Sequence, residues 1–259
     1  MAWAWCVFRR THYDDAMTTC PKCQYRRTAI DSNVHPDICP SCGIVYGKWL
    51  AKQSDAQEAI SIEPEIRQSF LQWLTEAPEK VDGIAFWARA ICAVLSAVWT
   101  LYFIVNGISW EVLGGSFMHN VNLMFHEFGH LFFSPFGRFM TILGGSLFQV
   151  IWPWTFLFAF LLKYRDTFAA SLMLWWSGQN FIDLSPYIGD AYYRALPLVG
   201  GGDEDSHDWG NLLTMTGMLD SYMDIARLSF FIGSVMMVAA LAWAALALQQ
   251  QWQVLKHST

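Results

Sequence analysis

The segment IAFWARAICAVLSAVWTLYFIV, Ile84 to Val105, decides the fold class of this chain. It is as long as a helix that crosses the hydrocarbon core of a bilayer, and Arg89 is its only charged residue. Two more segments of this kind follow, Phe139 to Leu162 and Leu228 to Leu248, and neither contains a charged residue. Each of the three therefore predicts a transmembrane helix.

Two weaker predicted spans contain ionisable residues and lie between the strong ones, Leu113 to Phe133 and Thr167 to about Tyr187. The chain has 259 residues, of which 54% are hydrophobic and only 15% are charged. A protein of this size has too small an interior to bury several such segments in water, so the composition excludes an ordinary soluble domain. We predict a mainly α fold, a polytopic transmembrane bundle of about four to five spans.

Four of the six cysteines form a regular pattern near the N-terminus, C-x2-C-x15-C-x2-C. At this spacing two tight knuckles meet around one tetrahedral zinc ion. The segment resembles the small zinc ribbons, and Gly43 suits the positive φ that such a turn requires. Two disulfides or a thiolate-bound iron are the alternatives. The predicted ligands are Cys20, Cys23, Cys39 and Cys42.

The charged residues divide the chain into regions, because about half of them lie within residues 1–82. We predict a zinc ribbon at 1–50, a polar linker at 51–82 and a transmembrane domain at 83–259. The second half of the linker predicts a short amphipathic helix, which lies on the membrane surface or docks on the ribbon. Its apolar residues are Ile66, Phe70, Leu71, Trp73 and Leu74. A net charge of -6 and the lack of a basic face argue against nucleic acid as a partner.

The weaker span at 113–133 contains the motif HEFGH. Residues four apart share one face of a helix, so His126 and His130 can bind one metal ion while Glu127 reaches a water molecule on it. Inside a membrane such residues are costly unless they are paired, bound to metal or in contact with water. The motif therefore predicts a zinc site in which Glu127 is the catalytic base.

A catalytic zinc ion usually has a third protein ligand in addition to water. His119 lies on the same helical face, but seven residues rise about 10 Å, which is too far for one metal ion. His119 is better suited to support the site or to relay protons. Asp190 and His207 are the predicted candidates for the third ligand, and Asp183 remains an alternative.

The arrangement resembles the site-2 protease family, zinc metalloproteases that cut substrates within the membrane. The resemblance rests on HEFGH and on NFIDLSPYIGDA, Asn180 to Ala191, which is similar to the family's segment ending in Leu-Asp-Gly. It implies that Asp190 completes the metal site and that Asn180 and Pro186 shape the substrate groove. This chain departs from the family at that point, because glycine precedes the aspartate and alanine follows it.

The stretch LGGSLFQ, Leu143 to Gln149, is similar to the glycine-containing stretch after the family's first motif, so Gly144 and Gly145 are further predicted substrate-binding residues. We expect irregular backbone at GGS and SPYIGD, lining a small wet cavity. The resemblance implies an intramembrane protease with one catalytic and one structural zinc ion, and a membrane protein or peptide as substrate. The expected setting is a lipid bilayer, the bacterial inner membrane, with the ribbon in the cytoplasm. The alternative is a non-proteolytic adaptor whose HExxH site is structural.

Overall fold

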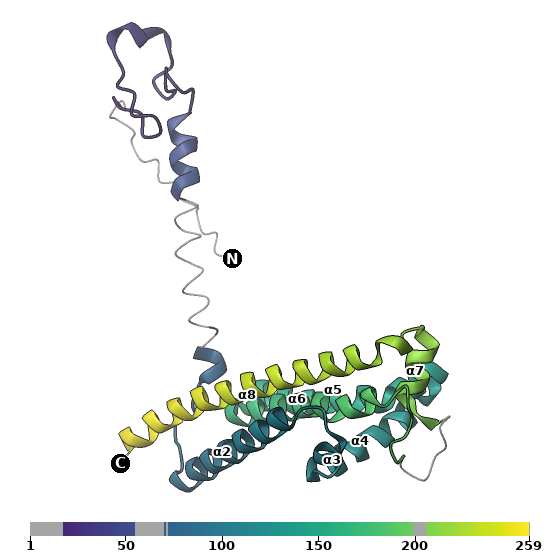
Figure 1. Cartoon of the computed structure of the whole chain (residues 1–259). Helices are drawn as coiled ribbons and strands as arrows, with labels where there is room; N and C mark the ends of the chain where they lie inside the picture. The colour runs from purple at the N-terminus through teal and green to yellow at the C-terminus, as the bar shows by residue number, and fades with distance from the viewer. Residues whose placement is uncertain (1–17, 55–69, 71, 199–205, 259) are drawn as a thin grey trace, which may run out of the picture. The chain divides into compact units, whose positions relative to one another are not determined.

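The computed structural model describes residues 18–54, 70, 72–198 and 206–258. The chain forms two compact units that divide between Phe70 and Leu71. The described residues are mainly helical, which confirms the mainly α part of the predicted fold class, and their only β structure is two isolated bridges (Figure 1). Of the predicted ribbon, residues 1–17 lie outside the described residues, as does most of the linker up to Leu71.

The smaller unit is built around two similar knuckles. In the first, the backbone N–H of Gln24 donates to the Cys20 carbonyl, and in the second that of Gly43 donates to the Cys39 carbonyl, each at 2.9 Å. Both turn residues have positive φ, 64° at Gln24 and 71° at Gly43. The expected conformation of Gly43 is therefore confirmed. The short helix η1 (Ala29–Asn33) lies between the knuckles, and residues 46–54 are helical after them.

The larger unit contains all the predicted membrane spans. Its elements are α2 (Gly83–Asn106), α3 (Trp110–Leu113), α4 (Phe117–Phe133), η2 (Ser134–Phe136), α5 (Arg138–Phe158), η3 (Ala159–Tyr164), α6 (Thr167–Gly189), α7 (Asp208–Thr216), η6 (Leu219–Ser221) and α8 (Tyr222–Ser258). Within the described residues, three helical segments are long and apolar enough to cross a bilayer: Gly83–Asn106, Arg138–Tyr164 and Leu219–His257. They match the three strong sequence predictions, whereas the total of four to five spans stays a prediction.

The two weaker predicted spans form α4 and α6. Helix α4 has 17 residues, which at 1.5 Å per residue give about 26 Å, less than the roughly 30 Å of hydrocarbon core. Helix α6 has 23 residues, and 15 of them are buried. Its polar side chains are thus turned into the bundle and not toward lipid.

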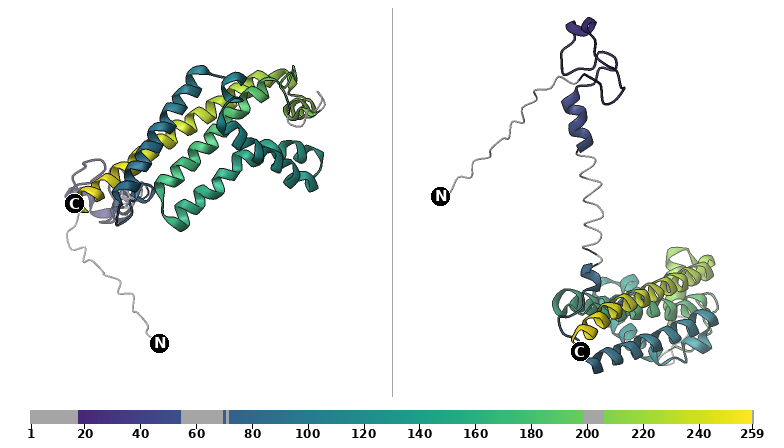
Figure 2. Two further views of the ribbon diagram at one scale, coloured as in Figure 1. Left: turned by 90° about the horizontal axis from the view of Figure 1, so that it is seen from below. Right: turned by 90° about the vertical axis from the view of Figure 1, so that its left-hand side faces the viewer.

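Helix α6 is the centre of the unit, with α8 along one side and α5 and α2 also in contact (Figures 1 and 2). A Cβ atom at Gly233 of α8 would lie only 2.4 Å from the Gly178 carbonyl oxygen of α6. The two backbones therefore approach closely, as small residues allow in membrane helix pairs. Buried apolar residues of α2, α3, α6 and α8 form a core cluster here, Phe103, Leu113, Trp175, Ile182, Met237 and Ala240.

Several contacts gather three parts of the chain at one end of this unit. Arg89 of α2 donates to Asp166, before α6, at 2.7 Å and to Gln251 of α8 at 3.0 Å. Arg165 pairs with Glu76 of the segment before α2. The start of α2, the turn between η3 and α6 and the end of α8 thus lie together.

The end of the predicted linker belongs to the helical unit. Residues 72–75 are helical, and Trp73 and Leu74 pack against a buried cluster that includes Leu157 and Leu161. The Trp243 indole N–H donates to the Leu74 carbonyl at 2.7 Å. The described part of the predicted amphipathic helix therefore docks on the bundle, a third possibility beside the ribbon and the membrane surface.

The expected irregular backbone is absent from two stretches that the structure describes, GGS within α5 and SPYIG within α6. Proline at position 186 removes the N–H that would bond to the Ile182 carbonyl four residues earlier. The Ser185 hydroxyl donates to that carbonyl at 2.6 Å. The prediction of a break was wrong because a neighbouring side chain satisfies the freed carbonyl and the helix continues to Gly189.

Candidate metal centre

Helix α4 places His126 and His130 one turn apart on the same face, as predicted. The Nε2 atoms of His126 and His130 lie 2.9 Å and 3.2 Å from Oδ2 of Asp208. The three possible ligand atoms all lie within 4.8 Å of one another. Ligands on a tetrahedral zinc ion with bonds near 2 Å are roughly 3.3 Å apart, so the spacing suits one metal ion.

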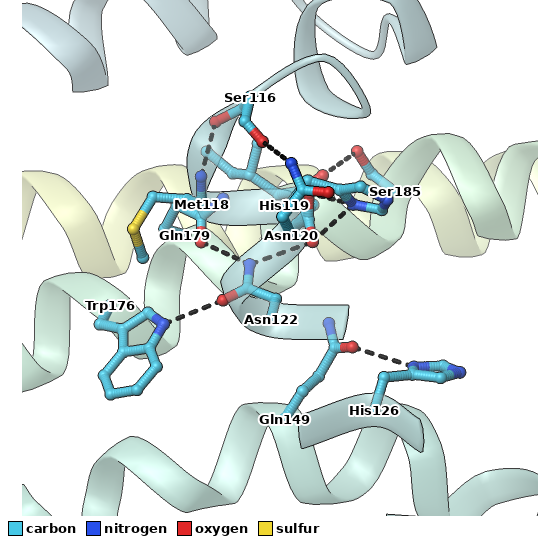
Figure 3. Close-up of polar contacts among 12 residues, drawn as sticks. Ser116, Met118, His119, Asn120, Asn122, His126, Gln149, Trp176, Gln179 and Ser185 are labelled. Carbon is cyan, nitrogen blue, oxygen red and sulfur yellow. Dashed lines mark hydrogen bonds and ion pairs between the residues drawn. The ribbon is translucent and has the colours of Figure 1, made fainter. Parts of the chain in front are cut away.

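Hydrogen bonds on the far side of each imidazole orient the rings. His126 Nδ1 donates to Gln149 Oε1 at 2.9 Å (Figure 3), and His130 Nδ1 donates to the Thr141 carbonyl at 2.8 Å. These acceptors hold the proton on Nδ1 and leave the Nε2 lone pair free. Two nitrogen lone pairs and a carboxylate oxygen then converge, an arrangement that a bound cation stabilises.

Glycines in α5 make room for this group. A Cβ atom at Gly145 would lie 2.6 Å from Nε2 of both His126 and His130, so a side chain there would enter the space between the donors. At Gly144 a Cβ atom would lie 2.7 Å from the Gly129 carbonyl oxygen of α4. Gly144 and Gly129 therefore let the two helices pack closely, and Gly145 keeps the metal site open. Gly144 and Gly145 were predicted to bind substrate, but neither is among the residues that line the cavity.

Gly145→Ala is expected to lower metal affinity of the helical unit by at least roughly tenfold, because even displaced supporting groups cost 10- to 100-fold. Chelator competition on the detergent-purified protein measures this. Gly189→Ala is the matched control, since a Cβ atom there meets only ordinary contacts at 3.7 Å. Equal metal affinity in the two variants would contradict the assigned role of Gly145.

Asp208 reaches the histidines through the docking of α7. Its backbone N–H donates to the Tyr187 hydroxyl of α6 at 2.9 Å. The neighbouring Trp209 donates its indole N–H to the Ser146 hydroxyl of α5 at 3.0 Å. Two contacts with different helices thus fix the first turn of α7, and with it the third donor.

The structure does not bring Asp190 or His207 to the histidine pair. Asp190 Oδ2 accepts from the Leu196 backbone N–H at 2.9 Å and lies 3.3 Å from His207 Nε2. His207 Nδ1 caps α7 by accepting from the Gly210 N–H at 3.0 Å. Among the described residues, the carboxylate that meets the two histidines is therefore that of Asp208 and not the predicted Asp190, because the Asp190 carboxylate is directed to the loop after α6.

Burial lowers the pKa of His207 and outweighs the opposing effect of the Asp190 carboxylate. The neutral ring fits its position as a helix cap, since Nδ1 must accept a hydrogen bond. The Asp190 carboxylate thus holds His207, the residue that precedes Asp208. The two predicted candidates therefore lie close to Asp208, the third member of the candidate donor group.

The other predicted site residues lie outside the donor group, which consists of His126, His130 and Asp208. Asp183 contacts His119 Nδ1 at 3.1 Å and accepts from Asn122 at 3.0 Å. Asn180 is fully buried and donates to the Trp176 carbonyl at 3.0 Å. Neither Asn180 nor Pro186 is among the residues that line the cavity beside the donor group, so their predicted part in a substrate groove has no counterpart there.

A cavity of about 350 Å³ opens beside the donor group. Glu127 lines it together with all three donors, so the predicted base and the candidate metal ligands share one space. Much of the remaining wall is apolar, with Trp110, Leu123, Ile142, Leu184, Leu196 and Leu198. The cavity can therefore hold an apolar chain next to the polar side chains of the donor group and Glu127.

The smaller unit contains the second group of possible metal ligands, the four cysteines. Their Sγ atoms lie within 4.8 Å of one another, with 3.7 Å between Cys20 and Cys42 and 3.6 Å between Cys23 and Cys39. Burial raises the pKa of the Cys39 thiol, but hydrogen bonds from the Cys42 and Ser41 backbone N–H groups outweigh it, and the pKa falls to about 6. A thiolate at neutral pH is the form that binds metal.

No protein-family model, curated protein or solved structure matches this chain. The evidence for a metal site in this chain is therefore the geometry of the site itself. Sequence reasoning missed Asp208, which stands in the acidic stretch DEDSHDW, and it missed the supporting groups Gln149, Thr141 and Tyr187. The only sequence signal for Asp208 was its place beside His207 at the start of a helix.

Proposed function

We propose that the chain is an intramembrane zinc metalloprotease that hydrolyses peptide bonds in membrane-embedded substrates. The observation that carries the proposal is the shared cavity of Glu127 with the donor group of His126, His130 and Asp208. Two imidazoles and a carboxylate are a common ligand set of catalytic zinc sites, which leave one position open for water. The test is cleavage by the wild type and its loss in Glu127→Gln.

The side chains have distinct roles in this proposal. His126, His130 and Asp208 hold the metal ion, and the Nδ1 hydrogen bonds keep both rings in the binding tautomer. When bound, zinc would supply a Lewis acid that acidifies water and polarises the scissile carbonyl. Glu127 takes a proton from the attacking water and passes it to the leaving nitrogen.

The apolar surroundings fit a substrate that is itself a membrane segment. Three helical segments of the unit are long and apolar enough to cross a bilayer. A peptide bond can be hydrolysed only where its carbonyl is accessible to water, so the cavity must be wet although its flanks face lipid. A cavity lining that contains both apolar side chains and Glu127 meets both requirements.

We infer that α4 is re-entrant and that α2, α5, α6 and α8 cross the membrane. The shortness of α4 supports this count, and so does the common position of the Arg89, Asp166 and Gln251 contacts. Four crossings from a cytoplasmic ribbon return Lys163 and Arg165 to the cytoplasm, in agreement with the positive-inside tendency.

A labelling experiment tests this topology. Lys163→Cys and Tyr193→Cys place thiols at exposed positions on opposite sides of the proposed membrane. A membrane-impermeant maleimide added to intact cells is expected to label position 193 and to label position 163 only after permeabilisation. Comparison with the parent protein corrects for native cysteines. Labelling of both positions from the same side would contradict four crossings.

A membrane-anchored adaptor with a structural metal site is the second candidate function. The cysteine group of the smaller unit favours it, because such modules often bind partners. An adaptor would keep metal at His126 and His130 and would have no use for the Glu127 carboxylate. Glu127→Gln therefore separates the two functions.

A further inference from the structure

His119 and Asp183 form a second polar pair on the wall of the cavity, separate from the metal donors. His119 Nδ1 lies 3.1 Å and 3.2 Å from the two oxygens of Asp183. The Asp183 side chain is 4% exposed, while His119 is 18% exposed and lines the cavity. Nδ1 of His119 therefore carries the proton that faces the carboxylate, and Nε2 is left toward the cavity.

A buried network holds this pair in place. Asn122 donates to Gln179 Oε1 at 2.7 Å and to Asp183 Oδ2 at 3.0 Å. The Trp176 indole N–H donates to Asn122 Oδ1 at 2.9 Å. Figure 3 shows Asn122 between the side chains of Gln179 and Trp176. Asn122 thus holds the Asp183 carboxylate in place. The carboxylate in turn fixes the orientation of the His119 ring.

Neither metal binding nor proton transfer by Glu127 uses this network. A buried Asp, His, Asn and Gln are costly in the membrane-spanning part of a protein, so such a group marks a functional site. The Trp110 ring packs edge-on against His119, with 5.2 Å between centroids, and steadies it from another side. Among the described residues, none forms a hydrogen bond with His119 Nε2 that would occupy it.

We propose that His119 is a substrate-positioning residue whose Nε2 accepts a hydrogen bond from a substrate backbone N–H, about three residues from the scissile bond. The inference rests on the proposed function, since the occupant is the substrate chain. His119 precedes His126 by two helical turns, about 10 Å along the axis, and an extended chain covers this distance in about three residues.

The chemistry of the cavity favours an N–H donor over an acidic group. An extended segment exposes N–H groups that no longer bond within a helix, and each is costly without a partner in an apolar space. Three carboxylates, Glu127, Asp183 and Asp208, lie on the wall, and the described lining residues include no lysine or arginine. An acidic group of a substrate would be repelled, whereas an N–H can bond to the Nε2 lone pair of His119.

The test uses synthetic apolar peptides of about 20 residues, the length of a membrane span, in which one backbone N–H at a time is replaced by an ester oxygen. In the wild type, one ester position about three residues from the cut is expected to lower kcat/KM roughly five- to tenfold. In His119→Phe the same ester is expected to have no further effect, as in a double-mutant cycle. Asp183→Asn is expected to weaken the ester effect at that same position.

Metal content and thermal unfolding of both variants are the controls for folding. If His119→Phe does not fold, the ester effect is measured in Asp183→Asn alone. An ester profile that is the same in the wild type and in the variants would overturn the inference. A photo-crosslinking arm with the same peptides uses Glu127→Gln protein and needs no cleavage. If the wild type cleaves nothing, the proposed function fails, while dependence of crosslinking on both His119 and one ester position would still support the contact.

Discussion

Glu127→Gln is expected to lower the cleavage rate of a membrane peptide by about 10²- to 10⁴-fold, the usual contribution of a general base. The amide has nearly the shape of the carboxylate but cannot take a proton from water. Glu127 lines the cavity and is not one of the three converging donors, so metal content should stay at the wild-type value. Cleavage of a reconstituted peptide, followed by mass spectrometry, gives the rate.

The matched control is Glu111→Gln, which changes a carboxylate in α3 that is not among the cavity-lining residues. It should retain full activity. Unchanged cleavage in Glu127→Gln would remove Glu127 from the mechanism. If the wild type cleaves no peptide while both variants keep their metal and their fold, the adaptor becomes the better account.

Asp208→Asn is expected to weaken metal binding by the helical unit by more than about 100-fold, since loss of a ligand exceeds the 10- to 100-fold cost of losing a supporting group. Asp190→Asn is expected to stay within about tenfold of the wild type, because its amide oxygen can still accept from the Leu196 N–H. The two variants remove the same charge from neighbouring parts of the chain. Chelator competition measures both affinities.

The reverse order would identify Asp190 as the ligand and return the site to the arrangement that the sequence resemblance implied. Equal, small losses in both variants would mean that the histidines bind without a carboxylate. Thermal unfolding of each variant in detergent shows whether a lost affinity reflects a lost fold.

Local sequence patterns predicted the features that depend on neighbouring residues. The three apolar segments are helices, and the first two have bounds close to those predicted, whereas the third extends from Leu219 to His257, well beyond the predicted Leu228 to Leu248. The spacing of His126 and His130 placed both rings on one helical face, and Gly43 has the positive φ that a tight turn after two cysteines requires. Each of these follows from helix or turn geometry over a few residues.

The third donor could not be predicted in this way. Asp208 lies 82 residues after His126, and tertiary contacts of α7, among them those with Tyr187 and Ser146, bring it to the site. Pro186 indicated a break in α6, yet the hydroxyl of Ser185 satisfies the carbonyl that the proline leaves free. In both cases the structure depends on specific side-chain contacts. The spacing of apolar residues along the sequence does not reveal such contacts.

Metal content of the detergent-purified protein tests whether the helical unit holds a metal ion at His126, His130 and Asp208. Wild type is compared with the His126→Ala, His130→Ala double variant and with the Cys39→Ala, Cys42→Ala double variant. We expect two zinc ions per chain in the wild type and one in each variant, with a different ion lost each time. A single zinc ion that is lost only with the cysteines would contradict it, because the histidine and aspartate group would then hold no metal.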